Sequence, residues 1–195
     1  MALRYIRGGG GCGRQAGPCV RPEESGAEVR LAGYIRDALD ALHRRDQPVT
    51  VVCVGTDRSS GDALGPLVGT FLKEVGPCPF YLLGTLDQPV HAGNLTEFWG
   101  EIQAASRQGP VVALDAVLGH VDCIGAVRVR PGPLAPAEGV RKKPLPHFGD
   151  VAVLGAINVG GFHAHAYDLV QHTRLGLVYP MAQLIRSALL IALME

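Results

Sequence analysis

Two aspartates are the residues of this 195-residue chain whose types and positions best suit catalysis. Asp62 closes a polar, glycine-bearing loop that follows an apolar, β-branched run at residues 49–54. Asp115 lies at the end of a second apolar run, residues 110–116. Apolar runs without alternation are typical of strands covered on both faces of a parallel sheet, and ligands bind such sheets at the carboxyl ends of the strands. We therefore expect both carboxyl groups at the same edge of one sheet.

Two carboxyl groups at short range are suited to acid/base chemistry because they cannot both ionise easily. The ionised group can act as a general base that activates water, and the protonated group as a general acid for the leaving group. Taken singly, each residue has a structural explanation, with Asp62 as the N-cap of the next helix and Asp115 as a strand-end residue. The pairing favours catalysis.

Other motifs in the chain favour neither a nucleotide nor a metal. A P-loop has four residues between its glycines and then a lysine, whereas five residues separate Gly55 from Gly61 and Asp62 takes the place of the lysine. A pair of imidazoles at His163 and His165 resembles two metal ligands, but nothing nearby completes a known pattern. The sequence predicts no cofactor and no bound metal.

The elements expected around these residues alternate between helix and strand. We predict helices at residues 25–44, 63–75, 94–107 and 177–195, and strands at residues 49–54, 80–83, 110–116, 124–130 and 150–157. The alternating strand at 124–130 is typical of an edge or half-exposed position. This order predicts a three-layer α/β/α sandwich with a mostly parallel twisted sheet, phosphorylase/hydrolase-like. We expect a flexible N-terminal tail at residues 1–24 and a single domain at 25–195, with a capping box from Ser25 to Glu28.

Composition points to a cytoplasmic protein. The chain has 18 basic and 18 acidic residues, so nothing steers it to nucleic acid or anionic lipid. No uninterrupted apolar run reaches the ~20 residues of a membrane helix, and the N-terminus lacks the apolar stretch of a signal peptide. The five cysteines are scattered and form no C-x-x-C pair, which favours a reducing compartment. We expect neither nucleic acid nor membrane as a partner.

The segments around both aspartates resemble the two aspartate motifs of the spore germination protease (Gpr) family. Residues 62–66 read D-A-L-G-P, and residues 115–116 read D-A at the end of a strand. The fuller pattern is similar to the YyaC-type spore protease-related proteins, with matching segments at residues 53–62, 84–95, 158–162 and 173–175. The resemblance runs from about residue 49 to the C-terminus. Gly61 stands where Gpr has a proline, and this chain is much shorter.

The resemblance implies a fold shared with hydrogenase-maturation endopeptidases, a spore-forming source and a location in the forespore. It implies endopeptidase activity, with Asp62 and Asp115 as the catalytic pair. The residues expected to bind substrate or support the pair are Asp57, Asp87, His91, Asn158 and Arg174. Arg174 would bias the pair by its charge or form an ion pair with Asp57. The expected partner is a protein or peptide substrate, such as a small spore protein, and a homo-oligomer is left open.

Two alternatives to the two-aspartate peptidase stay open. In the maturation enzymes, an acidic residue near each of these positions binds nickel together with a histidine, and the candidate histidines here are His91, His120 and His147. A metal-dependent endopeptidase is therefore the second interpretation. A third is a non-catalytic sporulation protein that keeps the fold and binds a protein or peptide in the same place.

Overall fold

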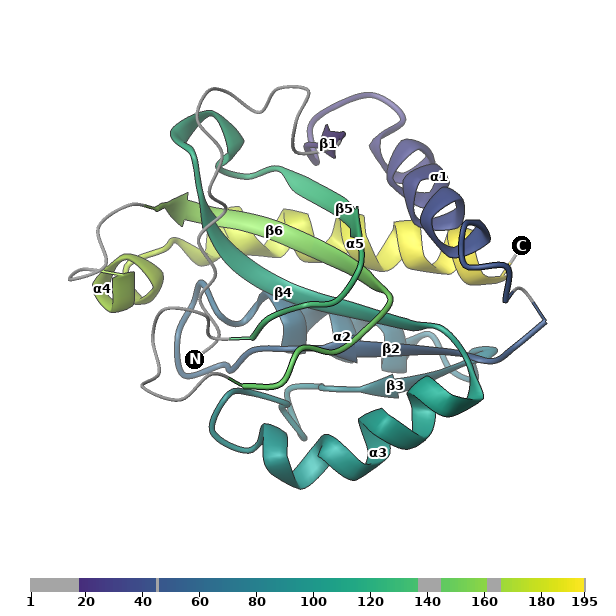
Figure 1. The fold of residues 1–195 in the computed structure, drawn as a ribbon. Helices are drawn as coiled ribbons and strands as arrows, with labels where there is room; N and C mark the ends of the chain where they lie inside the picture. The colour runs from purple at the N-terminus through teal and green to yellow at the C-terminus, as the bar shows by residue number, and fades with distance from the viewer. Residues whose placement is uncertain (1–17, 45, 137–144, 161–165, 195) are drawn as a thin grey trace.

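The computed structural model describes residues 18–44, 46–136, 145–160 and 166–194, arranged around one six-stranded sheet (Figure 1). The strands are β1 (Cys19–Val20), β2 (Val49–Cys53), β3 (Phe80–Leu83), β4 (Val111–Gly119), β5 (Val127–Pro131) and β6 (Val151–Val159), in the order β1-β5-β6-β4-β2-β3. The run from β6 to β3 is parallel, whereas β5 is antiparallel to β6 and β1 is antiparallel to β5. The sheet is therefore mostly parallel, as predicted.

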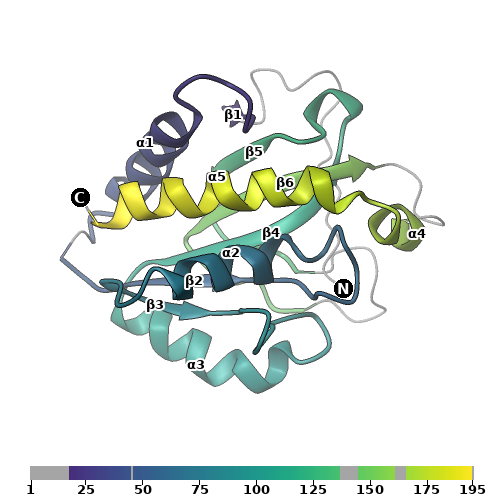
Figure 2. The same ribbon diagram turned by 180° about the vertical axis from the view of Figure 1, so that it is seen from behind.

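Helices cover both faces of this sheet. They are α1 (Ala27–Asp40), α2 (Leu64–Glu74), α3 (Leu95–Gln108), α4 (Ala166–Gln171) and α5 (Leu175–Met194), with a 3-10 turn, η1 (Val121–Cys123), after β4. Helices α1, α2 and α5 share one core cluster, and α3 lies on the opposite face (Figures 1 and 2). The three-layer α/β/α sandwich expected from the sequence is confirmed.

The two layers of the core explain why the β2 sequence lacks alternation. Val51 and Cys53 point into the cluster formed with α1, α2 and α5, while Val52 and Val54 point into the cluster on the α3 side. All four side chains are fully buried. A strand with apolar contacts on both faces needs an apolar residue at every position. The buried Cys53 thiol is part of this packing, and burial raises its pKa to about 12.

Helix α5 is long and apolar enough to cross a membrane by length and composition alone. It instead crosses the face of the sheet beside α1 and α2, as Figure 2 shows, and buries residues such as Met181, Ile185 and Leu189. Core helices of soluble proteins pass the same test of length and composition. The helix begins earlier than predicted, so Pro180 lies inside it, beyond the first turn in which we expected it.

Three local expectations are wrong. The predicted tail overlaps β1, which pairs with β5, while residues 1–17 lie outside the described part of the chain. Strand β5, which was expected at an edge, lies inside the sheet, because β1 pairs with it on one side and β6 pairs with it on the other. The capping box of Ser25 and Glu28 does not form, since α1 starts after Gly26, which has a φ of 67° and makes no side-chain cap.

Candidate active site

Asp62 is placed by a tight loop between β2 and α2. The backbone N–H of Thr56 donates to the Asp62 carbonyl oxygen at 3.1 Å, which folds the loop back on its own start. Gly55 has a φ of 145°, and a Cβ there would lie 2.0 Å from the same Asp62 oxygen. A Cβ at Gly65 would lie 2.1 Å from the carbonyl oxygen of Val54. The two glycines therefore allow the loop and the first turn of α2 to approach the end of β2 closely.

Asp115 lies in the middle of β4, because this strand continues to Gly119 instead of ending near residue 116. The shorter β2 stops beside it. Cys53 pairs with Leu114, and the N–H of Val54 donates to the Leu114 carbonyl oxygen at 2.8 Å. Asp115 is therefore level with the carboxyl end of β2, where the Asp62 loop begins.

The structure thus brings both aspartates to the carboxyl edge of β2 and β4, and both are 0% exposed. The capping explanation for Asp62 fails, because the N-cap position of α2 is Ala63 and no side chain caps this helix. Buried carboxyl groups are rare in proteins unless they are paired or functional. Both carboxyl groups therefore lie at the end of the sheet where parallel sheets bind their ligands.

The same loop packs against the end of β6 and the region of α4. The N–H of Gly61 donates to the Val170 carbonyl oxygen at 3.2 Å, and a Cβ at Gly61 would lie 2.4 Å from the Ile157 side chain. The same Cβ would lie 2.9 Å from the Val170 carbonyl oxygen, so a larger residue at this position would require its neighbours to shift. The Ser59 hydroxyl is also buried, with no hydrogen-bond partner among the described residues.

Asn158 forms structural hydrogen bonds at the end of β6. Its Nδ2 donates to the Leu169 carbonyl oxygen at 2.9 Å and to Thr173 Oγ1 at 3.3 Å. Its Oδ1 accepts from the N–H of Val159 at 2.9 Å. The amide therefore ties β6 to the segment between α4 and α5, which supports the carboxyl edge from outside.

His91 is half-buried just before α3, where its Nδ1 accepts from the N–H of Gly93 at 3.0 Å. Its own N–H donates to Asn94 Oδ1 at 2.8 Å. Burial is the largest cause that lowers the pKa of His91; the positive charge of Arg58 also lowers it, while Glu97 acts in the opposite direction. The ring is therefore neutral near pH 7.

The remaining predicted residues are charged and exposed. The loop between β2 and α2 that ends at Asp62 is called the aspartate loop below. The loop that leads to His91 lies beside it, because Gly55 N–H donates to the Val90 carbonyl oxygen at 2.8 Å. Asp87, in the same loop, instead forms a 3.1 Å ion pair with Lys73 at the surface. Asp57 and Arg174 are both exposed, and no ion pair between them occurs in the described part of the chain.

Arg128 is a buried charge that sequence reasoning missed. It is 5% exposed, and its Nη2 lies 3.9 Å from Cys123 Sγ. The alternation of residues 124–130 indicated that its side of the strand meets solvent. In the structure, Leu134 and Phe148 of the following segment pack with the core cluster on this face of the sheet. No local pattern in the sequence signals that long-range cover.

The histidines considered as metal ligands do not gather around the aspartates. His120 forms a 3.0 Å contact with Asp122 on the surface, and His147 is exposed. Among the residues that the structure describes, no group of three or more His, Cys, Asp or Glu side chains is arranged to hold a metal ion. His163 and His165 lie outside the described residues.

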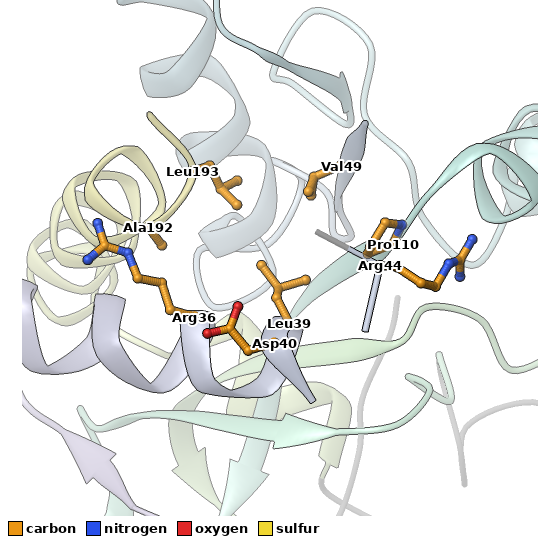
Figure 3. A pocket seen from close by; sticks show the side chains of 8 residues that line it. All are labelled: Arg36, Leu39, Asp40, Arg44, Val49, Pro110, Ala192 and Leu193. Atoms are coloured by element: carbon orange, nitrogen blue, oxygen red, sulfur yellow. The ribbon is translucent and has the colours of Figure 1, made fainter. Parts of the chain in front are cut away.

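A pocket of about 690 Å³ lies at the opposite edge of the sheet (Figure 3). It is lined by residues from the ends of α1 and α5 and from the starts of β2 and β4: Arg36, Leu39, Asp40, Arg44, Val49, Pro110, Ala192 and Leu193. None of the residues predicted to act in catalysis or substrate binding lines it. The candidate site therefore does not coincide with this pocket.

Comparison with known proteins confirms the YyaC-type resemblance. "Uncharacterized protein YyaC" of Bacillus subtilis (strain 168) is 44% identical over 172 residues, which cover 87% of this chain and 82% of that protein. The crystal structure of a [NiFe] hydrogenase maturation protease, HycI from Thermococcus kodakarensis KOD1, is 21% identical with a TM-score of 0.47, covering 73% of this chain and 92% of that one. Residues 21–188 match the family described as "Protein of unknown function (DUF1256)", and the chain belongs to that family.

Proposed function

We propose that this protein is a cytoplasmic endopeptidase of spore-forming cells, in which Asp62 and Asp115 hydrolyse peptide bonds of a spore protein within the forespore. One observation supports the chemistry above all others. Two carboxyl groups with no exposed surface lie at the carboxyl edge of neighbouring parallel strands. The similarity of residues 62–66 and 115–116 to the Gpr motifs suggests the reaction class, and the role in spores rests on that resemblance.

Burial makes a purely structural role for both residues costly. Removing a carboxylate from water without compensation is strongly unfavourable, so a buried carboxyl group is retained where it is paired, neutral or useful. Asp62 does not cap α2. Asp115 is the one charged residue in β4, a strand in which every residue is buried. Buried titratable groups at a ligand-binding edge of a sheet are candidates for a functional site.

The proposed reaction uses one proton held by the pair. The ionised aspartate removes a proton from a water molecule as the water oxygen attacks the peptide carbonyl carbon. The protonated aspartate then donates its proton to the peptide nitrogen as the C–N bond breaks. The products are a new carboxyl group and a new amine. The pair again holds one proton, now on the aspartate that began as the base.

Substrate access requires a movement of the protein. Neither carboxyl group is exposed, so a peptide reaches them only when the carboxyl edge of the sheet opens. The aspartate loop presents Asp57 and Arg58 to solvent on its outer side. Binding energy from a long peptide substrate is a suitable source for such an opening, because contacts remote from the reacting bond can drive a conformational change.

The test is cleavage of a proteome-derived peptide library from sporulating Bacillus subtilis, with mass spectrometry of new termini. We expect wild-type protein to cleave, and Asp62→Asn and Asp115→Asn to lose about 10²- to 10⁴-fold in rate. Asp37→Asn is the matched control, since it makes the same substitution at an exposed position on α1, outside the candidate site. Thermal unfolding of each variant checks that the fold is kept.

The outcomes separate the three interpretations of the sequence. Full activity in either buried variant would overturn the two-aspartate mechanism. Cleavage that a chelator abolishes and added nickel restores would favour the metal-dependent enzyme. Saturable binding of library peptides without any new termini would instead favour a non-catalytic binding protein.

A further inference from the structure

We propose that the outer surface of α2 and α5 is an interface between two copies of this chain, related by a two-fold axis. The surface consists of Leu67, Phe71 and Val75 from α2 and its last turn, and of Leu175 and Tyr179 from the start of α5. It is called the α2–α5 surface below. The inference goes beyond the proposed peptidase activity, because it concerns two helices and not the carboxyl groups at the edge of the sheet.

Helical spacing places these five side chains in two adjacent rows. Residues 67, 71 and 75 recur at every fourth position along α2, and residues 175 and 179 do so along α5. Side chains four positions apart lie on the same side of a helix. The rows meet where the rings of Phe71 and Tyr179 pack edge to face, with centroids 5.4 Å apart. Figure 2 shows the two helices side by side on one face of the sheet, so the rows form one apolar surface.

This apolar surface is exposed although both helices are packed on the sheet. The side chains of Leu175, Tyr179 and Val75 are 50%, 44% and 41% exposed, while Leu67 and Phe71 are half-buried. Single exposed apolar side chains need no explanation, whereas a group of them marks an interaction site. The other large exposed apolar side chains of the described residues are scattered over separate elements: Val29, Tyr81, Val121 and Met194.

Two charges of opposite sign flank the α2–α5 surface. Glu74 is exposed at the end of α2, and Arg174 is exposed just before α5 begins. Neither forms an ion pair with any residue that the structure describes. Lys73, the neighbour of Glu74, is instead 3.1 Å from Asp87. Glu74 and Arg174 are therefore available to groups on a partner.

The direction of the helices puts these two charges at opposite ends of the surface. Both helices begin at the carboxyl edge of the sheet, because Gly65 lies against Val54 at the end of β2 and Thr173 contacts Asn158 at the end of β6. Arg174 therefore lies at the carboxyl-edge end, on the α5 side. Glu74 lies toward the amino edge, on the α2 side, and the apolar rows lie between the two charges.

This arrangement is complementary to itself. A two-fold axis that lies in the interface and passes midway between Arg174 and Glu74 exchanges the two positions, so each charge faces its opposite on the other copy. The ion pair then forms twice at the rim, around an apolar centre, which is the usual anatomy of an interface. The chain has 18 basic and 18 acidic residues, so two copies carry no net charge that would repel them. Charge complementarity of one surface with itself favours a second copy over an unrelated partner.

The direct test is the molar mass in solution, measured by sedimentation velocity over a dilution series. We expect wild-type protein to reach twice the 20.6 kDa of one chain and to dissociate on dilution. Tyr179→Glu should weaken the dimer at least about 30-fold, because it places a charge in the apolar centre. Leu175→Glu should weaken it in the same direction.

Tyr81→Glu is the matched control for this apolar position. Tyr81 is 62% exposed, and its neighbours Phe80 and Leu82 pack in the cluster on the α2 side of the sheet. Successive side chains of a strand alternate between faces, so Tyr81 projects to the opposite face. This variant should keep the wild-type dimer, and circular dichroism checks that every variant is folded.

Exchange of the two charges tests the symmetry itself. Glu74→Arg and Arg174→Glu should each weaken the dimer at least about tenfold, because like charges then face one another in two places. The double variant restores both ion pairs with reversed sign and should return to within about threefold of the wild-type dissociation constant. Glu101→Arg, at an exposed position of α3 on the other face of the sheet, should have no effect.

Several results would overturn the interface. A wild-type protein that stays monomeric at every concentration is one, and a dimer that survives Tyr179→Glu is another. A double charge variant as weak as the single variants would also contradict the two-fold arrangement. If the wild-type protein is monomeric and Tyr179→Glu loses peptide cleavage, the surface binds substrate and not a second copy. A dimeric protein without cleavage activity would refute the peptidase function while retaining the interface.

Discussion

The two edges of the central sheet hold their charged groups in opposite ways. At the amino edge, Arg36, Asp40 and Arg44 line an open pocket of about 690 Å³. Arg44 donates to Gln47 Oε1 at 2.7 Å and to the Ser106 carbonyl oxygen at 3.1 Å. At the carboxyl edge, by contrast, the side chains of Asp62, Asp115 and Arg128 are buried.

The pocket and the two buried aspartates therefore lie at opposite edges of the same sheet. Charges at a wet surface cost little and contribute little, so their presence at the amino edge needs no special explanation. Buried charges are costly and persist where they balance one another or act. The carboxyl edge is therefore the better candidate for function.

Among substitutions that test this difference between the edges, the largest loss of stability is expected at Gly55, the glycine that allows the aspartate loop to close. We expect Gly55→Ala to destabilise the protein by more than about 2 kcal/mol and to abolish cleavage, because φ is 145° and the new Cβ meets the Asp62 carbonyl oxygen. Gly100→Ala in α3 is the control. It has open space around it and should stabilise by about 0.5–1 kcal/mol. Urea unfolding measures both, and equal stabilities would contradict the tight-loop account.

A smaller effect is expected at the amino edge. Arg44→Gln should cost no more than about 1 kcal/mol in urea unfolding and leave peptide cleavage unchanged, because Arg44 is partly exposed and lies 4.0 Å from Asp150. A loss of cleavage in this variant, with the fold intact, would move the functional site toward the pocket. That result would reverse the comparison between the edges.

The smallest effect concerns His91, which lies beside the aspartate loop. Its pKa in the folded protein is lowered, so the unfolded chain binds the proton more readily, and stability should fall as pH drops below about 6.5. Arg58→Gln should raise the pKa of His91 only in part, because burial is the larger cause. Ring-proton NMR titration measures the shift. A wild-type pKa at or above the usual value would be inconsistent with this environment.

The sequence predicted the parallel half of the fold well because its signals are local. The β2 and β3 boundaries followed from apolar runs, and α2 from the loop that precedes it. The antiparallel part, β1 and β5, depends on contacts between segments that are distant in the sequence. The pairing of β1 with β5 leaves no periodic pattern in the chain, and neither does the packing of Leu134 and Phe148 on the face of β5 that carries Arg128.

The candidate site shows the same division. Strand ends pointed to Asp62 and Asp115 directly, and the structure places both at one edge. The full length of β4 was missed, because residues 117–119 continue an apolar run with no signal of where pairing ends. Asp87 and Asp57 were grouped with the pair by resemblance alone, and both lie at the surface.

The measurement that tests the central claim most directly compares one substitution at the two edges in the same cleavage assay. Asp115→Asn removes a buried carboxylate at the carboxyl edge, and Asp40→Asn removes one that lines the pocket at the amino edge. We predict that Asp115→Asn, folded as judged by circular dichroism, loses about 10²- to 10⁴-fold in cleavage rate while Asp40→Asn keeps the wild-type rate. Loss of activity in Asp40→Asn together with full activity in Asp115→Asn would contradict the account.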